Sequence, residues 1–159
     1  MPLAQESNWL QVSVRNLHDS VATPLFTNLS KLSQQVTWLD LGNTPATDQT
    51  LQTLANFPNL TRLHLEKTTV TDEGLVHLQG LENLEYLNLY GTAITDEGLQ
   101  HLASLKKLKK LYLWQTKVSE TGVQTLKTAL PTLEIDTGIE EEAIKAFTAA
   151  TTENTESVN

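Results

Sequence analysis

The sequence repeats with a period of 24 residues, and this repeat limits the possible folds more than any other feature. The segment TDEGLVHL at 71–78 returns as TDEGLQHL at 95–102, with seven of its eight residues identical. Pairs of leucines one residue apart follow the same step: Leu39 and Leu41, Leu63 and Leu65, Leu87 and Leu89, Leu111 and Leu113. A unit this short cannot bury its own apolar side chains, so the copies must stack on one another to form a continuous core.

Each unit is predicted to contain one strand, one turn and one helix. The paired leucines alternate with other residues at period two, as in a strand, whereas Leu99, Leu102 and Leu105 follow at helical spacing. Thr71 and Thr95 stand at the helix starts, where their side-chain oxygens can accept hydrogen bonds from the first free amides. We therefore expect an α/β fold: a right-handed solenoid with a short parallel sheet of about five strands on its concave face and helices on its convex face.

A column of threonines recurs with the same period. Its members are Thr44, Thr68, Thr92 and Thr116. They stand where the leucine-rich repeat consensus L-x-x-L-x-L-x-x-N/C-x-L has Asn or Cys, so the units resemble leucine-rich repeats. Each hydroxyl is predicted to bond to the backbone of its own or a neighbouring coil, inside the turn, and the column is interpreted as structural.

The ends of the chain depart from the repeat. We expect three parts: an N-terminal cap unit at 1–35, leucine-rich repeats at 36–138, and a short C-terminal helix with a disordered polar tail at 139–159. In the cap unit, LQVSV at 10–14 alternates as a strand does. At the far end, Leu133 and Ile135 are predicted to be the inward pair of the last strand, 22 residues after Leu111 and Leu113.

Composition excludes several classes of site and partner. The chain has no cysteine, which excludes disulfides, thiolate metal sites and covalent haem attachment. Its formal net charge is -8 with only 11 Lys and Arg residues, so nucleic acid, which needs clustered basic side chains, is not an expected partner. No run of about 18 apolar residues occurs, so we expect no direct membrane insertion by this chain.

The amino-acid sequences of the repeats show a narrower resemblance. The units between 36 and 138 resemble bacterial leucine-rich repeats that have T-D-x-G-L at the helix start. Segments such as LEYLNLYGTAITDEGLQHL and LKKLYLWQTKVS are similar to the C-terminal repeat module of bacterial membrane proteins that also carry a c-type cytochrome domain. In that family the haem-binding and membrane-spanning parts lie upstream of the repeats. The resemblance implies an excised or free-standing C-terminal module without its own haem site, located in the cell envelope or periplasm.

With the leucines inward, the alternate strand residues point to the concave side, where the repeat aligns them in columns about 4.8 Å apart. The predicted columns are Trp38, Arg62, Tyr86 and Lys110; then Asp40, His64, Asn88, Tyr112 and Glu134; then Gly42, Glu66, Tyr90, Trp114 and Asp136. We call the surface formed by these columns the sheet face. It holds five of the nine aromatic residues, although it contains only a small share of the chain.

Two interpretations of the sheet face follow from the same residues. Arg62 can stack on both Trp38 and Tyr86, which would make the columns a ladder that stiffens the sheet. Aromatic residues are also overrepresented in binding hot spots, and solenoids characteristically bind through such faces. The leading hypothesis is a non-enzymatic interaction module that binds a protein partner, or another domain of its own polypeptide. The predicted contact residues are Trp38, Arg62, His64, Glu66, Tyr86, Asn88, Tyr90, Lys110, Tyr112 and Trp114.

Two other functions stay open. Carbohydrate binding is the first, because flat rings beside Asn88, Glu66 and Asp136 offer what sugar faces and sugar hydroxyls require. A structural spacer within a larger cytochrome-bearing envelope protein is the second. None of these functions requires a cofactor, and none is expected.

No catalytic or metal site is predicted. His64 lies beside Asp40 and Glu66, but an acid–base role would need a nucleophile or a shaped pocket, and the sequence shows neither. His77 and His101 share a helix position in successive units. Without a third column of ligands, these two are interpreted as solvated repeat residues. An enzyme is therefore the function that the sequence supports least.

Overall fold

The computed structural model describes residues 9–15 and 28–138, and the strands in these ranges form one parallel sheet. They are β1 (Leu10–Ser13), β2 (Val36–Asp40), β3 (Arg62–His64), β4 (Tyr86–Asn88), β5 (Lys110–Tyr112) and β6 (Glu134–Asp136). Each strand pairs with the next one along the chain. The strand expected at 10–14 is found as β1, whereas the helix expected within 139–159 lies outside the described residues.

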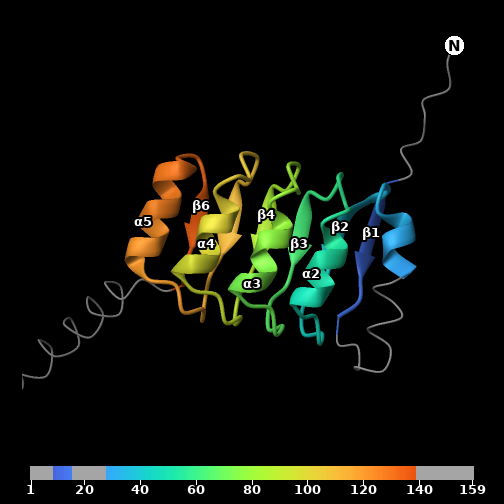
Figure 1. Ribbon diagram of the computed structural model, residues 1–159, viewed down its shortest axis with the longest axis horizontal. Coiled ribbons are helices and arrows are strands. Elements are labelled where there is room, and N and C mark those ends of the chain that lie inside the picture. The colour runs from blue at the N-terminus through green and yellow to red at the C-terminus, as the bar shows by residue number, and fades with distance from the viewer. Residues whose placement is uncertain (1–8, 16–27, 139–159) are drawn as a thin grey trace, which may run out of the picture.

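Helices follow strands β2 to β5 and lie side by side on one side of the sheet (Figure 1). They are α2 (Asp48–Leu54), α3 (Asp72–Leu75), α4 (Asp96–Leu102) and α5 (Glu120–Ala129), with the 3-10 helix η2 (Val76–Leu78) directly after α3. A second 3-10 helix, η1 (Ser30–Leu32), precedes β2. This arrangement confirms the predicted α/β solenoid of strand, turn and helix units. Within the described ranges, none of these helices combines the length and the apolar character needed to cross a bilayer.

The core is a stack of leucines in register. The first leucine of each pair lies opposite its counterpart on the adjacent strand and is fully buried. These residues are Leu39, Leu63, Leu87 and Leu111. Burial of one such side chain stabilises a fold by about 1.5–3 kcal/mol, so the buried leucines strongly favour the stacking of each coil on the next.

A residue in the left-handed region turns the chain after each of strands β2 to β5. These residues are Asn43 (φ 54°), Lys67 (φ 53°), Gly91 (φ 67°) and Gln115 (φ 53°). The threonine that follows each of them donates its hydroxyl hydrogen bond to the carbonyl of the leucine three residues earlier, at 2.6–2.7 Å. The structural role predicted for the threonine column is confirmed, and each bond closes a turn within its own coil.

The two predicted N-cap threonines behave differently. The Thr95 side chain accepts a hydrogen bond from the Glu97 amide at 3.2 Å, as predicted. Thr71 also stands before its helix, but its side chain accepts no cap bond. The first turn of α3 is tighter, because the Gly74 amide bonds to the backbone carbonyl of Thr71 at 3.1 Å. Both threonines are therefore N-cap residues as predicted, but only Thr95 makes the predicted side-chain bond.

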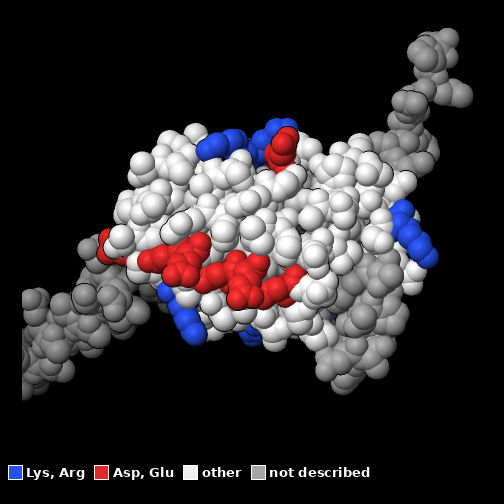
Figure 2. Space-filling view, in the orientation of Figure 1, with Lys and Arg blue, Asp and Glu red and all other residues white. Residues whose placement is uncertain are grey.

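An aspartate in the first turn of each of α2, α3 and α4 bonds to the start of the next helix. Asp72 accepts two hydrogen bonds from Thr95, at 2.8 Å from its amide and 2.6 Å from its hydroxyl. The same pair of bonds joins Asp48 to Thr71 and Asp96 to Ser119. Together with neighbouring glutamates, the aspartates form an acidic band across the helical side of the molecule (Figure 2).

The glycine of the T-D-x-G motif makes room for that aspartate. A Cβ atom placed on Gly98 would overlap Oδ1 of Asp72. Gly74 and Gly122 lie against the aspartates of their preceding coils in the same way. The motif therefore joins the coils, because the aspartate of one copy requires the glycine of the next.

The register of the last strand differs from the prediction. Ile135 pairs with Leu111, so the strand keeps the regular step of the repeat and does not arrive two residues early. Leu133 is buried as expected of an inward residue, but it precedes β6, and its amide bonds to the Leu130 carbonyl at 3.1 Å. The backbone ladder sets this register, with the Leu113 amide bonded to the Asp136 carbonyl at 2.8 Å. Leu133 and Ile135 both pack on the core as predicted, but the predicted step of 22 residues was wrong.

The corrected register moves the last members of two columns. Glu134 lies beside Lys110 in the first column, and Asp136 lies beside Tyr112 in the second. The third column ends in Gly138, which packs against Trp114. The sheet face therefore keeps its aromatic residues, but its acidic edge lies one column earlier than the sequence pattern indicated.

Candidate interaction surface

Four rings form a zigzag across strands β2 to β5, which we call the ring ladder: Trp38, His64, Tyr86 and Tyr112. Centroid separations along the ladder are 5.8 Å, 4.8 Å and 5.2 Å. Successive rings alternate between the first and second columns, so each one contacts a diagonal neighbour on the next strand. Ring pairs at such distances contribute about 0.5–1.5 kcal/mol beyond their burial. The ladder therefore stiffens this side of the sheet, whatever else it does.

Arg62 was predicted to stack on both Trp38 and Tyr86, and its contact with Tyr86 is the one observed. Its guanidinium carbon lies 6.0 Å from the centroid of the Tyr86 ring. Trp38 instead meets the edge of His64, with 74° between the two ring planes. In the same column, the charged atoms of Lys110 and Glu134 lie 3.3 Å apart at an exposed position. The first column thus carries charges of both signs beside the ring ladder.

Tyr90 and Trp114 form a second aromatic pair, which follows strands β4 and β5. Their rings meet edge to face with centroids 6.3 Å apart, and the Lys67 ammonium lies 5.4 Å from the Tyr90 centroid. Gly138 lies so close to the indole that a Cβ there would overlap it. Trp114 is 40% exposed, more than any other aromatic residue of the sheet face.

Asn88 is turned toward the backbone. Its side-chain oxygen accepts a hydrogen bond from the Tyr90 amide at 3.0 Å, two residues along the chain. Asp40 accepts the same bond from the Gly42 amide, also at 3.0 Å. Asn88 therefore fixes the backbone at Tyr90, and Asp40 fixes the backbone at Gly42 in the same way.

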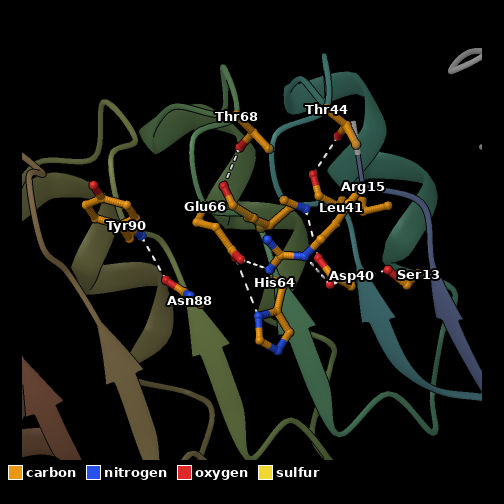
Figure 3. Close-up of polar contacts among 12 residues, drawn as sticks. Ser13, Arg15, Asp40, Leu41, Thr44, His64, Glu66, Thr68, Asn88 and Tyr90 are labelled. Atoms are coloured by element: carbon orange, nitrogen blue, oxygen red, sulfur yellow. Dashed lines mark hydrogen bonds and ion pairs between the residues drawn. The ribbon is translucent and has the colours of Figure 1, made fainter. Parts of the chain in front are cut away.

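His64 of the ring ladder also belongs to a cluster of polar and charged side chains, which Figure 3 shows. Nε of Arg15 donates to Oδ2 of Asp40 at 2.5 Å, and Nη2 donates to Oε1 of Glu66. Nδ1 of His64 faces the other oxygen of Glu66, Oε2, at 3.5 Å. The two carboxylates are buried, while the Arg15 side chain is 38% exposed. We call Arg15, Asp40, His64 and Glu66 the Arg15 cluster.

The cluster changes the acidity of its members. Burial raises the pKa of Glu66, but the His64 imidazole and the Arg15 guanidinium outweigh this effect, so the pKa lies below its ordinary value. The hydrogen bond to Asp40 raises the pKa of Arg15. Burial also raises the pKa of the nearby Tyr86 hydroxyl. Glu66 is therefore an ionised carboxylate inside the protein at neutral pH, bound to a charged Arg15.

Sequence reasoning missed Arg15. The outward residues of β1 are Gln11 and Ser13, which pair with Trp38 and Asp40. The next outward residue, Arg15, therefore falls beside the third column. Its alternation with the preceding residues was a usable signal, but β1 is offset from the 24-residue step, and the columns built on that step did not reach it.

Comparison with known proteins identifies the fold. The sequence profile of a family described as "Leucine Rich repeat" matches residues 58–78 and 80–103. The crystal structure of an internalin C2 from Listeria monocytogenes is 33% identical over 68% of this chain, with a TM-score of 0.56. The chain has the fold of a leucine-rich repeat solenoid. It spans 45% of the internalin C2 chain, so the two are similar over less than half of that protein.

Two further structures share the leucine-rich repeat fold. A second internalin of the same species, inlF, is 21% identical over 70% of this chain and 32% of its own, with a TM-score of 0.59. The actin-binding site 2 of leiomodin-1 is 17% identical over 94% of this chain and 88% of its own, with a TM-score of 0.61. At these identities the likeness shows the fold alone. No protein with a curated description matches the chain.

Proposed function

We propose that this leucine-rich repeat solenoid is a non-enzymatic interaction module whose sheet face binds a partner protein. One observation carries the proposal: Tyr90 and Trp114 stand at outward positions that the leucine core does not need, and Trp114 is 40% exposed. Rigid, half-polar rings of this kind are overrepresented in binding hot spots. Solenoids also present such faces as extended binding surfaces.

The proposed contact set is narrower than the predicted one. Glu66 is buried in the Arg15 cluster and is left out, because it is only 7% exposed. The remaining contact residues are Trp38, Arg62, His64, Tyr86, Asn88, Tyr90, Lys110, Tyr112 and Trp114. Charges of both signs border these rings, a mixture that suits the polar rim of a protein interface.

The test compares two matched variants. Tyr90→Ala with Trp114→Ala removes the aromatic pair, whereas Val76→Ala removes an equally exposed apolar side chain, also 40% exposed, from η2. We expect the double variant to lose at least about tenfold in affinity, because hot-spot residues typically contribute about 2 kcal/mol or more. Val76→Ala should bind as wild type does. Affinity is measured against proteins captured from cells of the source organism, and thermal melts confirm that both variants still unfold cooperatively.

Equal binding by the double variant and by wild type would refute the assignment of the site. The sheet face would then be a ladder that only stiffens the sheet, as expected of a structural spacer.

Carbohydrate binding is the alternative function, and ring geometry supports it less. In the ring ladder His64 is tilted by 32° to Tyr86, and Tyr86 by 41° to Tyr112, so each ring is turned toward its neighbour and not laid flat for a sugar. Titration with oligosaccharides, followed by tryptophan fluorescence, separates the two functions. A saturable change in fluorescence that disappears in Trp114→Ala would favour carbohydrate over protein.

A finer proposal is that the partner is a domain of the same polypeptide, in a cytochrome-bearing protein of the cell envelope. This proposal is supported only by the resemblance of the repeat sequences to that family. An antibody against this solenoid, applied to fractionated cells, measures the size of the native polypeptide. We expect a large, membrane-associated band that stains for haem. A band near 17.6 kDa in the soluble fraction would contradict this proposal while leaving protein binding by the sheet face intact.

A further inference from the structure

Three side chains of types that bind metals converge in the Arg15 cluster (Figure 3). Asp40 and His64 are the last residues of β2 and β3 and lie opposite each other in the sheet. Glu66 follows His64 by two positions. One imidazole nitrogen and two carboxylate oxygens from these residues all lie within 4.8 Å of one another. Asp40 and Glu66 are only 4% and 7% exposed.

Two of the atoms that face one another have no hydrogen-bond partner within the part of the chain that the structure describes. They are Nδ1 of His64 and Oε2 of Glu66, both buried and 3.5 Å apart. Buried polar atoms are normally satisfied, since leaving one without a partner destabilises the fold. An ion held between Nδ1 and Oε2 would satisfy both atoms at once.

We propose that Asp40, His64 and Glu66 form a binding site for one divalent transition-metal ion of the zinc class. Imidazole and carboxylate are ligands that Zn²⁺ uses, at about 2.0–2.2 Å from the metal. Two such ligands of a tetrahedral ion lie about 3.3 Å apart. The distance between Nδ1 and Oε2, 3.5 Å, is close to that value. Three protein ligands leave a fourth position for water or another ligand.

The other contacts of the cluster hold the two carboxylates in place. Arg15 occupies Oδ2 of Asp40 and Oε1 of Glu66, so Oε2 of Glu66 faces Nδ1 of His64 and not Arg15. The Gly42 amide donates to Oδ1 of Asp40 at 3.0 Å, and an acceptor oxygen retains a second lone pair for an ion. Carboxylates that bind metals are commonly oriented by such outer hydrogen bonds. Gly42 also provides space, since a Cβ there would lie 2.8 Å from Glu66.

Arg15 has a second effect, because its positive charge opposes a bound cation. The Arg15 side chain is 38% exposed, so it lies on the side from which an ion can enter. Replacing Arg15 by an uncharged side chain of similar length should therefore tighten metal binding and not weaken it. This expectation separates a metal site from a closed ion-pair network, in which Arg15 is needed and no ion binds.

The experiment is calorimetric titration of the chelator-treated full chain with Zn²⁺. We expect one ion per chain in wild type and a loss of at least about tenfold in affinity in Glu66→Gln and in Asp40→Asn, which keep the shapes of the ligands but not their charges. Arg15→Met should bind more tightly than wild type. His101→Asn is the matched control, because His101 is a histidine of α4 that lies outside the cluster and contacts Gln79 at 3.0 Å. It should bind as wild type does.

A thermal melt with and without Zn²⁺ provides the second readout. A ligand that binds only the folded chain raises the melting temperature, so Zn²⁺ should raise it in wild type and in His101→Asn but not in Glu66→Gln or Asp40→Asn. Absence of saturable Zn²⁺ binding in wild type would overturn the proposal. So would unchanged binding in Glu66→Gln and Asp40→Asn, or weaker binding in Arg15→Met. The site goes beyond the proposed interaction function and does not rest on it.

Discussion

Single residues explain why T-D-x-G-L recurs. Asp72 is bonded through both oxygens to Thr95 and lies against Gly98, so one carboxylate fixes the start of the next helix. The sequence placed these acids in the first helical turn, where the helix dipole favours them. It could not show that each aspartate bonds to the following coil, because a repeat shows which residues recur and not which copy their side chains reach.

Replacing Gly98 by Ala tests the contact between aspartate and glycine. The new Cβ would overlap Asp72, and overpacking of this kind costs about 1–3 kcal/mol. The higher helix propensity of Ala, about 1 kcal/mol, offsets part of that cost. We expect a lower free energy of unfolding, measured by chemical denaturation. Gly80→Ala is the control, because a Cβ there meets nothing within 4 Å, and it should not destabilise the chain. Equal stability of the two variants would remove the proposed reason for the motif.

The bonds from Ser119 make Asp96 a reporter of pH. The Ser119 hydroxyl donates to Oδ2 of Asp96 at 2.6 Å, and the Ser119 amide donates to Oδ1 at 2.7 Å. These two bonds hold the pKa of Asp96 below the ordinary value for Asp. A carboxyl whose pKa is lower in the folded state adds stability above its ordinary pKa of about 3.9 and loses it as pH falls through the folded value. Wild type should therefore exceed Asp96→Asn in denaturation midpoint at neutral pH, and the gap should close as the solution is acidified below about pH 4. A gap that is constant with pH would contradict this assignment.

Among the elements, the strands and helices of the repeats were predictable from leucine spacing, but the last strand was not. Leu133 and Ile135 both pack on the core, but only the parallel hydrogen-bond ladder shows that Ile135, and not Leu133, lies opposite Leu111. The cap strand β1 was recognised from its alternation, yet its offset from the repeat hid Arg15. Elements that follow the repeat were therefore predicted well, and the register of the end elements required their backbone partners.

The turn that follows β6 holds the exposed indole of the sheet face. Gly138 has φ 99°, which disfavours other residues, and it packs directly against Trp114. We expect Gly138→Ala to cost about 1–3 kcal/mol through strain and overlap, and to shift the tryptophan fluorescence. In a Trp114→Ala background the cost should fall, because the overlap is removed. A cost that is the same in both backgrounds would assign it to backbone strain alone.

At the scale of the whole molecule, the sheet face carries aromatic side chains and a cluster of charged side chains. The ring ladder and the Tyr90–Trp114 pair run across strands and turns, while the Arg15 cluster joins β1 to the turn after β3. The helical side instead carries the acidic band. The sequence predicted which residues share the sheet face, since the columns follow from the 24-residue repeat. It did not predict how the rings pair, because diagonal contacts depend on side-chain conformation.

The central claim is that a partner meets the sheet face and not the helical side. We would place a photo-crosslinking residue at Lys110, exposed on the sheet face, or at Gln100, exposed on α4, and irradiate cells that produce each variant. The account predicts one discrete crosslinked protein from Lys110 and none from Gln100. It also predicts that this crosslink disappears when Tyr90 and Trp114 are replaced by Ala. A crosslink from Gln100 alone, or one from Lys110 that survives the loss of both rings, would contradict it.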